Sequence, residues 1–394
     1  MVASKTDMLP CMLLFLIACS GDVADTSTEE TPDSVDACVS AWADQITAPD
    51  EAGPDTQIHG TSVFDGENVW VAWSLPNDFN TFDIWMARYG CDGALQLGPM
   101  TVTDGPDNEL DPSLAVSGDR LLMAWTSSTT HSSNNLDIRY QVFDLAGAPV
   151  SDAGDLQAER AGVVVTGNAT LPRVASRADG FVLAGSWGHD DAPAFQAFSV
   201  LLDRDGNVIG DAADAELDVE HSQTAVDVAM HGESVVLAWQ EDSTSSTSPV
   251  SWWSDGGVVA KLGEPAARPT LTVAAEGVWA AWDSDDGTVW LQPPLGEAVA
   301  LSLPGFSHSP RLSAAGDTVV LLTMSIEDGI YNSLHLSTVD ESGVVATLPL
   351  DTVGTPSVYG VDVTLIDQSH ALVVWQDGEN PAFRLRAQWL TLSL

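Results

Sequence analysis

Seven short apolar runs recur along the chain, and they constrain its fold more than any other feature. Each ends at a tryptophan or at a residue in the same place: VWVAW (69–73), LLMAW (121–125), VLAG (182–185), VVLAW (235–239), VWAAW (278–282), VVLLT (319–323) and LVVW (372–375). Successive runs end 41 to 60 residues apart. A repeat of that length is one supersecondary unit, and its copies must stack to bury a common core.

The residues around each run predict a unit of four antiparallel strands. A short strand precedes the run, as in LPRVAS (171–176) or SPRLSA (309–314), and a turn such as AGD (315–317) joins the two. Gly and Asp supply the backbone angles of such a hairpin. An alternating strand and a last strand follow, for example DIRYQVFD (137–144) and GVVATL (343–348). The continuous apolar run is then a second strand covered on both faces.

Seven such units resemble a seven-bladed β-propeller, an all-β fold of four-stranded antiparallel blades, over nearly all of residues 38–394. A pair of β-sandwich domains is the competing all-β interpretation. The last repeat offers three strands, and the segment VSAWADQITA (39–48) precedes the first repeat without a place in it. We therefore expect residues 39–48 to complete the last blade, which removes a free sheet edge.

The first 18 residues have the features of an export signal. One cation, Lys5, precedes an apolar run from Met8 to Ala18, which is too short to span a bilayer. Leu16-Ile17-Ala18-Cys19 resembles the lipobox of bacterial lipoproteins. The resemblance implies that residues 1–18 are removed and that Cys19 carries fatty acyl chains such as palmitate. Ser20 then favours the outer membrane of the cell envelope, on its periplasmic or surface face. Cleavage after Ala18 without lipid, giving a secreted protein, is the alternative.

The charge balance excludes one class of partner. The chain has 57 acidic and 13 basic residues and a net charge of −44, so it repels nucleic acid and anionic headgroups. We therefore expect no nucleic-acid partner and membrane contact only through the N-terminal lipid. Residues 19–37 are acidic and lack apolar periodicity, which predicts a disordered tether. The acidic surplus serves solubility or, alternatively, cation binding.

The four cysteines divide by position. Cys11 leaves with the signal and Cys19 carries lipid, so Cys38 and Cys91 remain. In an oxidising envelope this predicts a disulfide between them. Two buried free thiols are the alternative.

The propeller resemblance also groups candidate site residues on one face, at the mouth of the central channel. We expect His59, His221 and His308 at equivalent positions just before inner strands. Arg173, Arg268 and Arg311 lie near the starts of three inner strands and could point into the channel mouth. Such residues suit a polar ligand or a divalent cation such as Ca²⁺. The alternative is that the histidines serve no ligand, since no tight metal-ligand spacing occurs, and that the arginines pair with surplus carboxylates.

No nucleophile elbow, phosphate-binding loop or dinucleotide fingerprint occurs in the sequence. We therefore expect a binding module for a protein, a glycan or a cation, and assign no catalytic residue. DSDDGTVW (283–290) resembles the Asp-box of sialidases, although its spacing is one residue short. This keeps open a glycoside hydrolase of the sialidase-like propeller type. A scaffold component of an envelope assembly is the third possibility.

Overall fold

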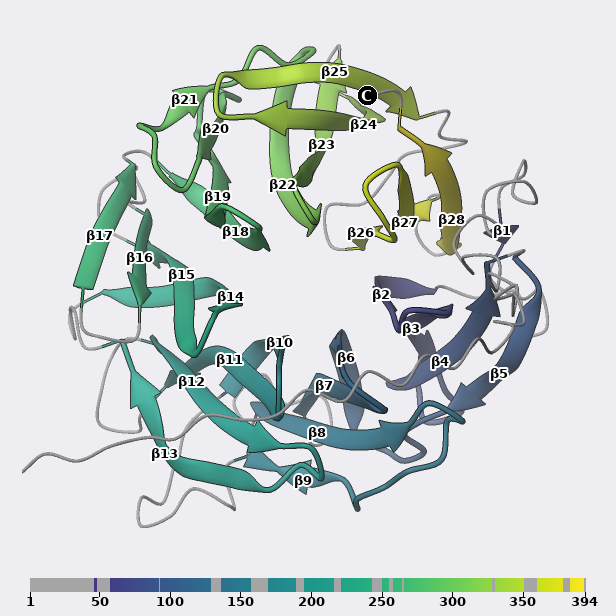
Figure 1. Cartoon of the computed structure of the whole chain (residues 1–394). Helices are drawn as coiled ribbons and strands as arrows, with labels where there is room; N and C mark the ends of the chain where they lie inside the picture. Colours follow the sequence, from purple (N-terminus) through teal and green to yellow (C-terminus); the bar gives the residue numbers. More distant parts are fainter. Residues whose placement is uncertain are drawn as a thin grey trace, which may run out of the picture.

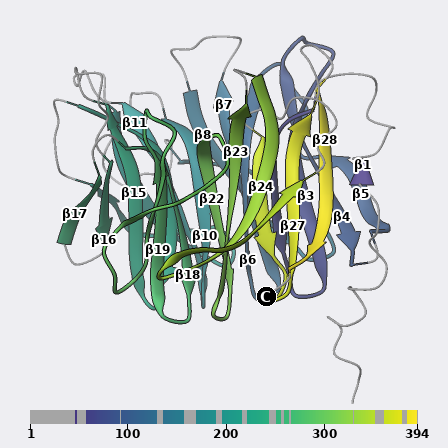
Figure 2. The same ribbon diagram turned by 90° about the horizontal axis from the view of Figure 1, so that it is seen from above.

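The computed structural model describes residues 46–47, 57–91, 93–128, 136–156, 169–188, 195–215, 221–242, 250–254, 258–263, 266–327, 330–350, 360–377 and 383–392. Their strands pair into four-stranded antiparallel sheets arranged around a central axis (Figure 1). In the view turned by 90°, the strands of neighbouring sheets run side by side between the two faces of the ring (Figure 2). The predicted all-β propeller with four-stranded antiparallel blades is confirmed. Across these ranges, no helix has the length and apolar character needed to cross a bilayer.

Six blades are each built from four consecutive strands, with the first strand innermost. Blades 1 to 3 comprise β2 (Ile58–Phe64), β3 (Asn68–Pro76), β4 (Phe82–Gly90) and β5 (Leu95–Thr101); β6 (Asn108–Ser117), β7 (Arg120–Ser128), β8 (Leu136–Asp144) and β9 (Gly154–Asp155); and β10 (Ala169–Arg177), β11 (Gly180–Gly188), β12 (Phe195–Asp203) and β13 (Val208–Asp214). Blades 4 to 6 comprise β14 (Ser222–His231), β15 (Ser234–Asp242), β16 (Val250–Ser254) and β17 (Val258–Gly263); β18 (Ala267–Ala274), β19 (Gly277–Asp283), β20 (Val289–Gln292) and β21 (Val299–Ala300); and β22 (Phe306–Ala315), β23 (Thr318–Glu327), β24 (Ile330–Asp340) and β25 (Gly343–Leu350).

The remaining sheet, blade 7, is composite. It contains β26 (Val361–Leu365), β27 (His370–Asp377), β28 (Arg384–Thr391) and, as its outer strand, β1 (Ile46–Thr47). β1 pairs antiparallel with β28, Ile46 opposite Ala387 and Thr47 opposite Arg386. Residues 46–47 therefore share one sheet with the last three described strands. The rest of segment 39–48 lies outside the described residues, so its contribution to this blade stays a prediction.

The second strand of each blade forms the core between neighbouring blades. Six tryptophans are at most 1% exposed, and five of them end the repeated apolar runs: Trp70, Trp73, Trp125, Trp239, Trp282 and Trp375. Because both faces of this strand meet a neighbouring blade, no polar alternation is needed. Full burial of such side chains supplies much of the hydrophobic stabilisation between blades.

Six inner strands share a bulge near the end at which they begin. At the first bulge residue the backbone is left-handed, with φ between 48° and 56°: His59, Asp111, Leu171, Ala225, Arg268 and Ser309. At each bulge the pairing of the inner strand with the second strand is interrupted and then resumes, for example between Thr170 and Arg173. Left-handed backbone is uncommon for residues other than glycine. Because it recurs, the bulge is a repeated element of this propeller. The bulge also changes the direction of the side chains that follow it.

Candidate site at the mouth of the central channel

The first paired residue after each bulge occupies the same position in every blade. In blade 3 this residue is Arg173, which pairs with Ala184, one residue before the end of the apolar run. Applied to all blades, the same register gives seven residues, called here the channel ring: Thr61, Ser113, Arg173, Asp227, Thr270, Arg311 and Asp362. Blade 7 has no described bulge, and its member of the channel ring is Asp362, which pairs with Val374. The fold thus brings seven distant residues to one level of the channel.

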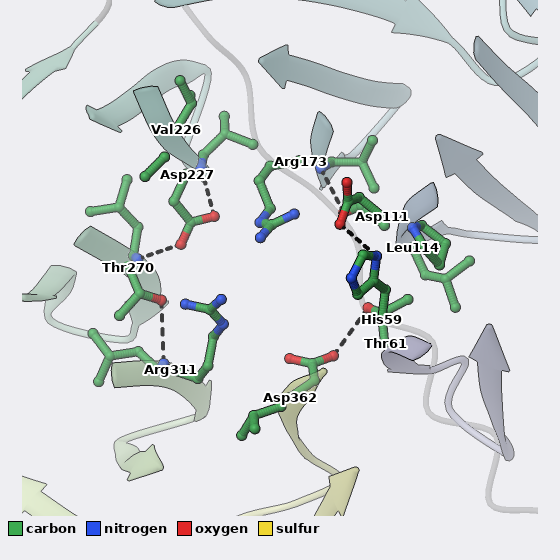
Figure 3. A pocket seen from close by; sticks show the side chains of 18 of the residues that line it. His59, Thr61, Asp111, Leu114, Arg173, Val226, Asp227, Thr270, Arg311 and Asp362 are labelled. Atoms are coloured by element: carbon green, nitrogen blue, oxygen red, sulfur yellow. Dashed lines mark hydrogen bonds and ion pairs between the residues drawn. The ribbon is translucent and has the colours of Figure 1, made fainter. Parts of the chain in front are cut away.

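All seven members of the channel ring line one cavity of about 260 Å³. Figure 3 shows the side chains of Arg173, Asp227, Arg311 and Asp362 converging from separate blades. His59, Asp111 and Arg268, which are bulge residues, line the same cavity. Three arginines, three aspartates and one histidine therefore line the cavity.

Two of the carboxylates bind backbone groups of two blades at once. Asp227 accepts a hydrogen bond from the N–H of Val228 in its own blade at 2.9 Å and one from Leu271 of the next blade at 2.8 Å. Asp362 accepts from Val363 in its own blade at 2.9 Å and from Ser62 of blade 1 at 2.8 Å. Inner strands are sheet edges, so their N–H groups need such partners. These two carboxylates join neighbouring blades.

Two of the three hydroxyl members of the channel ring also accept a hydrogen bond from a backbone N–H of the next blade, at longer distances. The Ser113 hydroxyl accepts a hydrogen bond from the N–H of Val174 at 3.2 Å. The Thr270 hydroxyl accepts from the N–H of Leu312 at 3.4 Å. Each of these N–H groups directly follows an arginine of the ring, on the blade after the hydroxyl.

The two ring arginines point their guanidinium groups into the cavity (Figure 3). Arg173 donates to the carbonyl of Pro172 at 2.9 Å, and Arg311 donates to that of Pro310 at 3.0 Å. Burial and the positive charge of Arg173 lower the pKa of Arg311, while the carboxylates of Asp227 and Asp362 oppose this shift. Burial raises the pKa of Asp362 against the opposing effects of the Ser62 N–H and Arg311. The ring is therefore a set of coupled charges of both signs.

His59 and Asp111 form a pair at the rim of the same cavity. The Nδ1 atom of His59 lies 2.8 Å from Oδ1 of Asp111. Burial acts to raise the pKa of Asp111, but the hydrogen bond and charge of His59, together with Arg173, outweigh it, so this pKa lies below its usual value. The other nitrogen-bearing edge of the imidazole faces the cavity (Figure 3).

Arg268 also lines the cavity, but its guanidinium is bound elsewhere. Its Nε and one terminal nitrogen lie 2.8 Å and 2.7 Å from Oδ2 of Asp283, which is fully buried. The same oxygen accepts a hydrogen bond from the N–H of Ser309 at 2.6 Å. Burial raises the pKa of Asp283, although Arg268 and the Ser309 N–H act against the rise. The sequence-based alternative, pairing with surplus acid, thus describes Arg268 but not the two ring arginines.

The predicted equivalence of three histidines is wrong. His59 is a bulge residue, His308 directly precedes the bulge residue Ser309, and His221 lies four residues before Ala225. The cavity lining includes neither His221 nor His308. His221 lies beside Glu241, with 3.6 Å between Nδ1 and Oε1, and the Nδ1 atom of buried His308 lies 2.9 Å from the Ser309 hydroxyl. Burial, aided by Arg268, lowers the pKa of His308 to about 4. The bulge shifts the register, so a place near the start of an inner strand does not by itself make these three histidines equivalent.

Four of the six predicted site residues therefore share the cavity: His59, Arg173, Arg268 and Arg311. Sequence reasoning missed the acids Asp111, Asp227 and Asp362 and the ring hydroxyls. A signal was present, because each ring member has a fixed place relative to the second strand.

Other site predictions fall in part outside the described residues. Within the ranges given above, no group of three or more His, Cys, Asp and Glu side chains is arranged to hold a metal ion. Cys19 and Cys38 lie outside those ranges. Cys91 lies in the turn after β4, and its pairing with Cys38 stays a prediction.

The fold and the cavity define a β-propeller whose channel mouth carries a ring of charged and hydroxyl side chains. The chain is similar to a protein of unknown function from Dyadobacter fermentans, with a TM-score of 0.57, 9% identity, and coverage of 89% of this chain and 99% of that one. It is also similar to the β-propeller domain of the Trilobed protease from Pyrococcus furiosus, with a TM-score of 0.50, 10% identity, and coverage of 87% and 99%. A third solved structure, an α-L-arabinanase from Penicillium chrysogenum, has a TM-score of 0.49 and 14% identity, with coverage of 84% of this chain and 93% of that one. No protein-family model and no curated protein matches the sequence. At these identities the similarity shows the fold alone.

Proposed function

We propose that this protein is an exported, lipid-anchored propeller that acts as a binding module at the bacterial cell envelope, with its ligand site in the channel-mouth cavity. The observation that carries the binding role is the convergence of Arg173, Arg311 and the His59–Asp111 pair on one cavity. Propeller scaffolds host many activities, so the argument rests on this site and not on the fold.

The cavity supports binding better than hydrolysis. Asp227 and Asp362 each hold two backbone N–H groups, which leaves them committed to the scaffold. A glycosidase needs one carboxyl group to give a proton and a second to act as base or nucleophile. The third acid, Asp111, is engaged by His59. The described part of the cavity thus holds no carboxyl pair that stands apart from structural bonds.

The envelope address has separate support in the sequence. Leu16-Ile17-Ala18-Cys19 resembles a lipobox, and the acidic segment 19–37 would separate the lipid from the propeller. A bound protein, a glycan or an oligomeric envelope assembly are all compatible with that position. The Ca²⁺ alternative has no ligand group in the described part of the chain to support it.

A ligand screen tests the binding role. Purified full-length protein in detergent would be screened by thermal shift against small molecules, oligosaccharides and Ca²⁺ salts. We expect ligands that raise the melting temperature of the wild type but not of an Arg173→Ala, Arg311→Ala double variant. If every stabilising ligand acts equally on both proteins, the cavity is not the binding site.

Hydrolysis is the second candidate, and one observation favours it. Asp111 holds one nitrogen of His59 while the other edge of the imidazole faces the cavity, which is the arrangement of a general base. A panel of fluorogenic glycosides tests it. Turnover by the wild type that is lost in His59→Gln or Arg173→Ala would replace the binding role with an enzymatic one. An inactive panel supports the binding module.

A further inference from the structure

The channel ring contains the same three-residue arrangement twice. Blades 2, 3 and 4 contribute Ser113, Arg173 and Asp227, and blades 5, 6 and 7 contribute Thr270, Arg311 and Asp362. In both sets the order is hydroxyl, guanidinium, carboxylate. The seventh member, Thr61, stands between the sets and donates its hydroxyl hydrogen to Asp362 at 3.1 Å.

The hydrogen bonds of the two sets also correspond one to one. In each set the hydroxyl accepts from the N–H that follows the arginine. In each set the arginine donates to the carbonyl of the proline before it. In each set the aspartate accepts from the N–H that follows it and from an N–H of the next blade. The N–H that follows a ring arginine is bound by the hydroxyl of the previous blade. Arginine has no acceptor atom, so it cannot do the same for the N–H that follows the aspartate of the next blade. The aspartate therefore binds that N–H itself.

This correspondence explains why the guanidinium groups remain directed at the cavity. The two aspartates use their oxygens on backbone N–H groups, and neither forms a described ion pair with Arg173 or Arg311. A guanidinium has five N–H donors, and each of these two makes one hydrogen bond within the described residues. Donor capacity therefore faces the cavity from both sets.

The two guanidinium groups also act on each other. They belong to blades 3 and 6, so they approach from roughly opposite sides of the ring, and Figure 3 shows them facing one another across the cavity. Their like charges repel. An anion between them would accept hydrogen bonds from both and would remove that repulsion.

We propose that the cavity recognises a carboxylate, which bridges Arg173 and Arg311 with one oxygen directed to each half of the ring. The inference rests on the proposed binding function and specifies its ligand class. Among anions, a singly charged group fits best, because Asp111, Asp227 and Asp362 line the cavity together with the two ring arginines. A doubly charged phosphate or sulfate would meet more repulsion from these carboxylates and from the net charge of −44. The chain has only 13 basic residues, and three of them line this one cavity.

Isothermal titration of the full-length protein in detergent tests the inference. The probes are glucuronate and acetate as carboxylates, glucuronamide as the uncharged match of glucuronate, and inorganic phosphate. We expect glucuronate to bind at least about tenfold more tightly than glucuronamide or phosphate, because charge-assisted hydrogen bonds to arginine are lost or opposed in the latter two. Acetate should compete with glucuronate.

Arg268 provides a matched control on the same cavity wall, because its guanidinium is already bound by Asp283. We expect Arg173→Ala and Arg311→Ala to weaken glucuronate binding by about 10- to 100-fold and Arg268→Ala by less than about threefold. If an alanine variant does not fold, Arg173→Lys and Arg311→Lys keep the charge but lose the paired donors, and we expect about a tenfold loss.

The outcomes separate this inference from the binding function. Equal affinity for glucuronate and glucuronamide, tighter binding of phosphate, or an equal loss in Arg268→Ala would each overturn carboxylate recognition. If a neutral oligosaccharide found in the thermal-shift screen still binds, the binding role survives that result. If no compound binds, both proposals are wrong.

Discussion

The carboxylate of Asp362 accepts a hydrogen bond from the backbone N–H of Ser62 at 2.8 Å, although 300 residues separate them in the sequence. The bond joins blade 7 to blade 1 beside the channel. Neighbouring contacts strengthen the same seam: the hydroxyls of Ser62 and Thr364 lie 2.9 Å apart, and the Thr61 hydroxyl donates to Asp362. The ring is therefore closed on its inner side by side chains, as well as on its outer side by β1.

Removing the Asp362 carboxylate should destabilise the ring. Asp362→Ala leaves two backbone N–H groups without their acceptor and removes one of the carboxylates near Arg311, and we expect a loss of about 2–4 kcal/mol in the free energy of unfolding. Asp362→Asn keeps one acceptor oxygen and should lose about half as much. Urea unfolding measures both. Asp227→Ala is the matched variant, because Asp227 makes the same two bonds between blades 4 and 5. A free energy of unfolding for Asp362→Ala within about 0.5 kcal/mol of wild type would contradict this role.

Stability should also depend on pH through Glu109, which is 3% exposed. Burial raises the pKa of Glu109 from 4.5 to about 7, although Arg139 and the Ser127 hydroxyl act to lower it. Between these two values the folded protein holds a proton that the unfolded chain has lost, so the contribution of Glu109 to stability falls as pH rises from 4.5 to 7. Glu109→Gln carries no charge, so its stability relative to wild type should rise by up to about 3 kcal/mol across this window.

Urea unfolding at pH 4.5 and pH 8 measures this difference. Asp107→Asn is the control, because Asp107 also lies near Arg139, at 3.5 Å, but on a more exposed site. A stability difference between Glu109→Gln and wild type that stays constant with pH would show that Glu109 titrates normally.

The Cys38–Cys91 disulfide can be measured directly. Intact mass after alkylation, with and without prior reduction, should show two additional alkyl groups only in the reduced sample. The bridge would connect the turn after β4 in blade 1 to the segment that leads into β1. Two alkylated cysteines in the unreduced protein would contradict it.

Lipidation of Cys19 is tested by a single substitution. Wild-type protein expressed with its signal should partition into detergent and carry the added mass of acyl chains on a peptide that begins at residue 19. Cys19→Ala should lack that mass and leave the detergent phase. Detergent partitioning that survives Cys19→Ala would point to another membrane contact.

The repeat in the sequence was sufficient to predict blade architecture, because burial on both faces imposes a continuous apolar second strand wherever a blade occurs. The runs ending at Trp73 and Trp375 show this, since every residue of both runs is buried within the second strand of its blade. The pairing of Ile46 with Ala387 also agrees with closure by an N-terminal strand.

The site was only partly predictable, and the reason is local. Arg173 and Arg311 were found because each follows a proline at the start of an inner strand. Asp227 follows valine in AVDV (225–228), and nothing in that stretch distinguishes it from an ordinary strand residue. Its role depends on a bulge that places it level with Arg173 of the previous blade. Contacts between blades are set by the ring geometry, which adjacent residues do not encode.

The repeated left-handed bulge gives six of the seven inner positions a common backbone, whatever side chain each carries. Serine, threonine, aspartate and arginine occupy that position in different blades without a change of register after the bulge. Ligand preference is therefore separable from folding at Arg173 and Arg311, whose side chains bind no backbone N–H of a neighbouring blade among the described residues. A substitution at either arginine would change the charge of the cavity and leave the hydrogen bonds between blades in place.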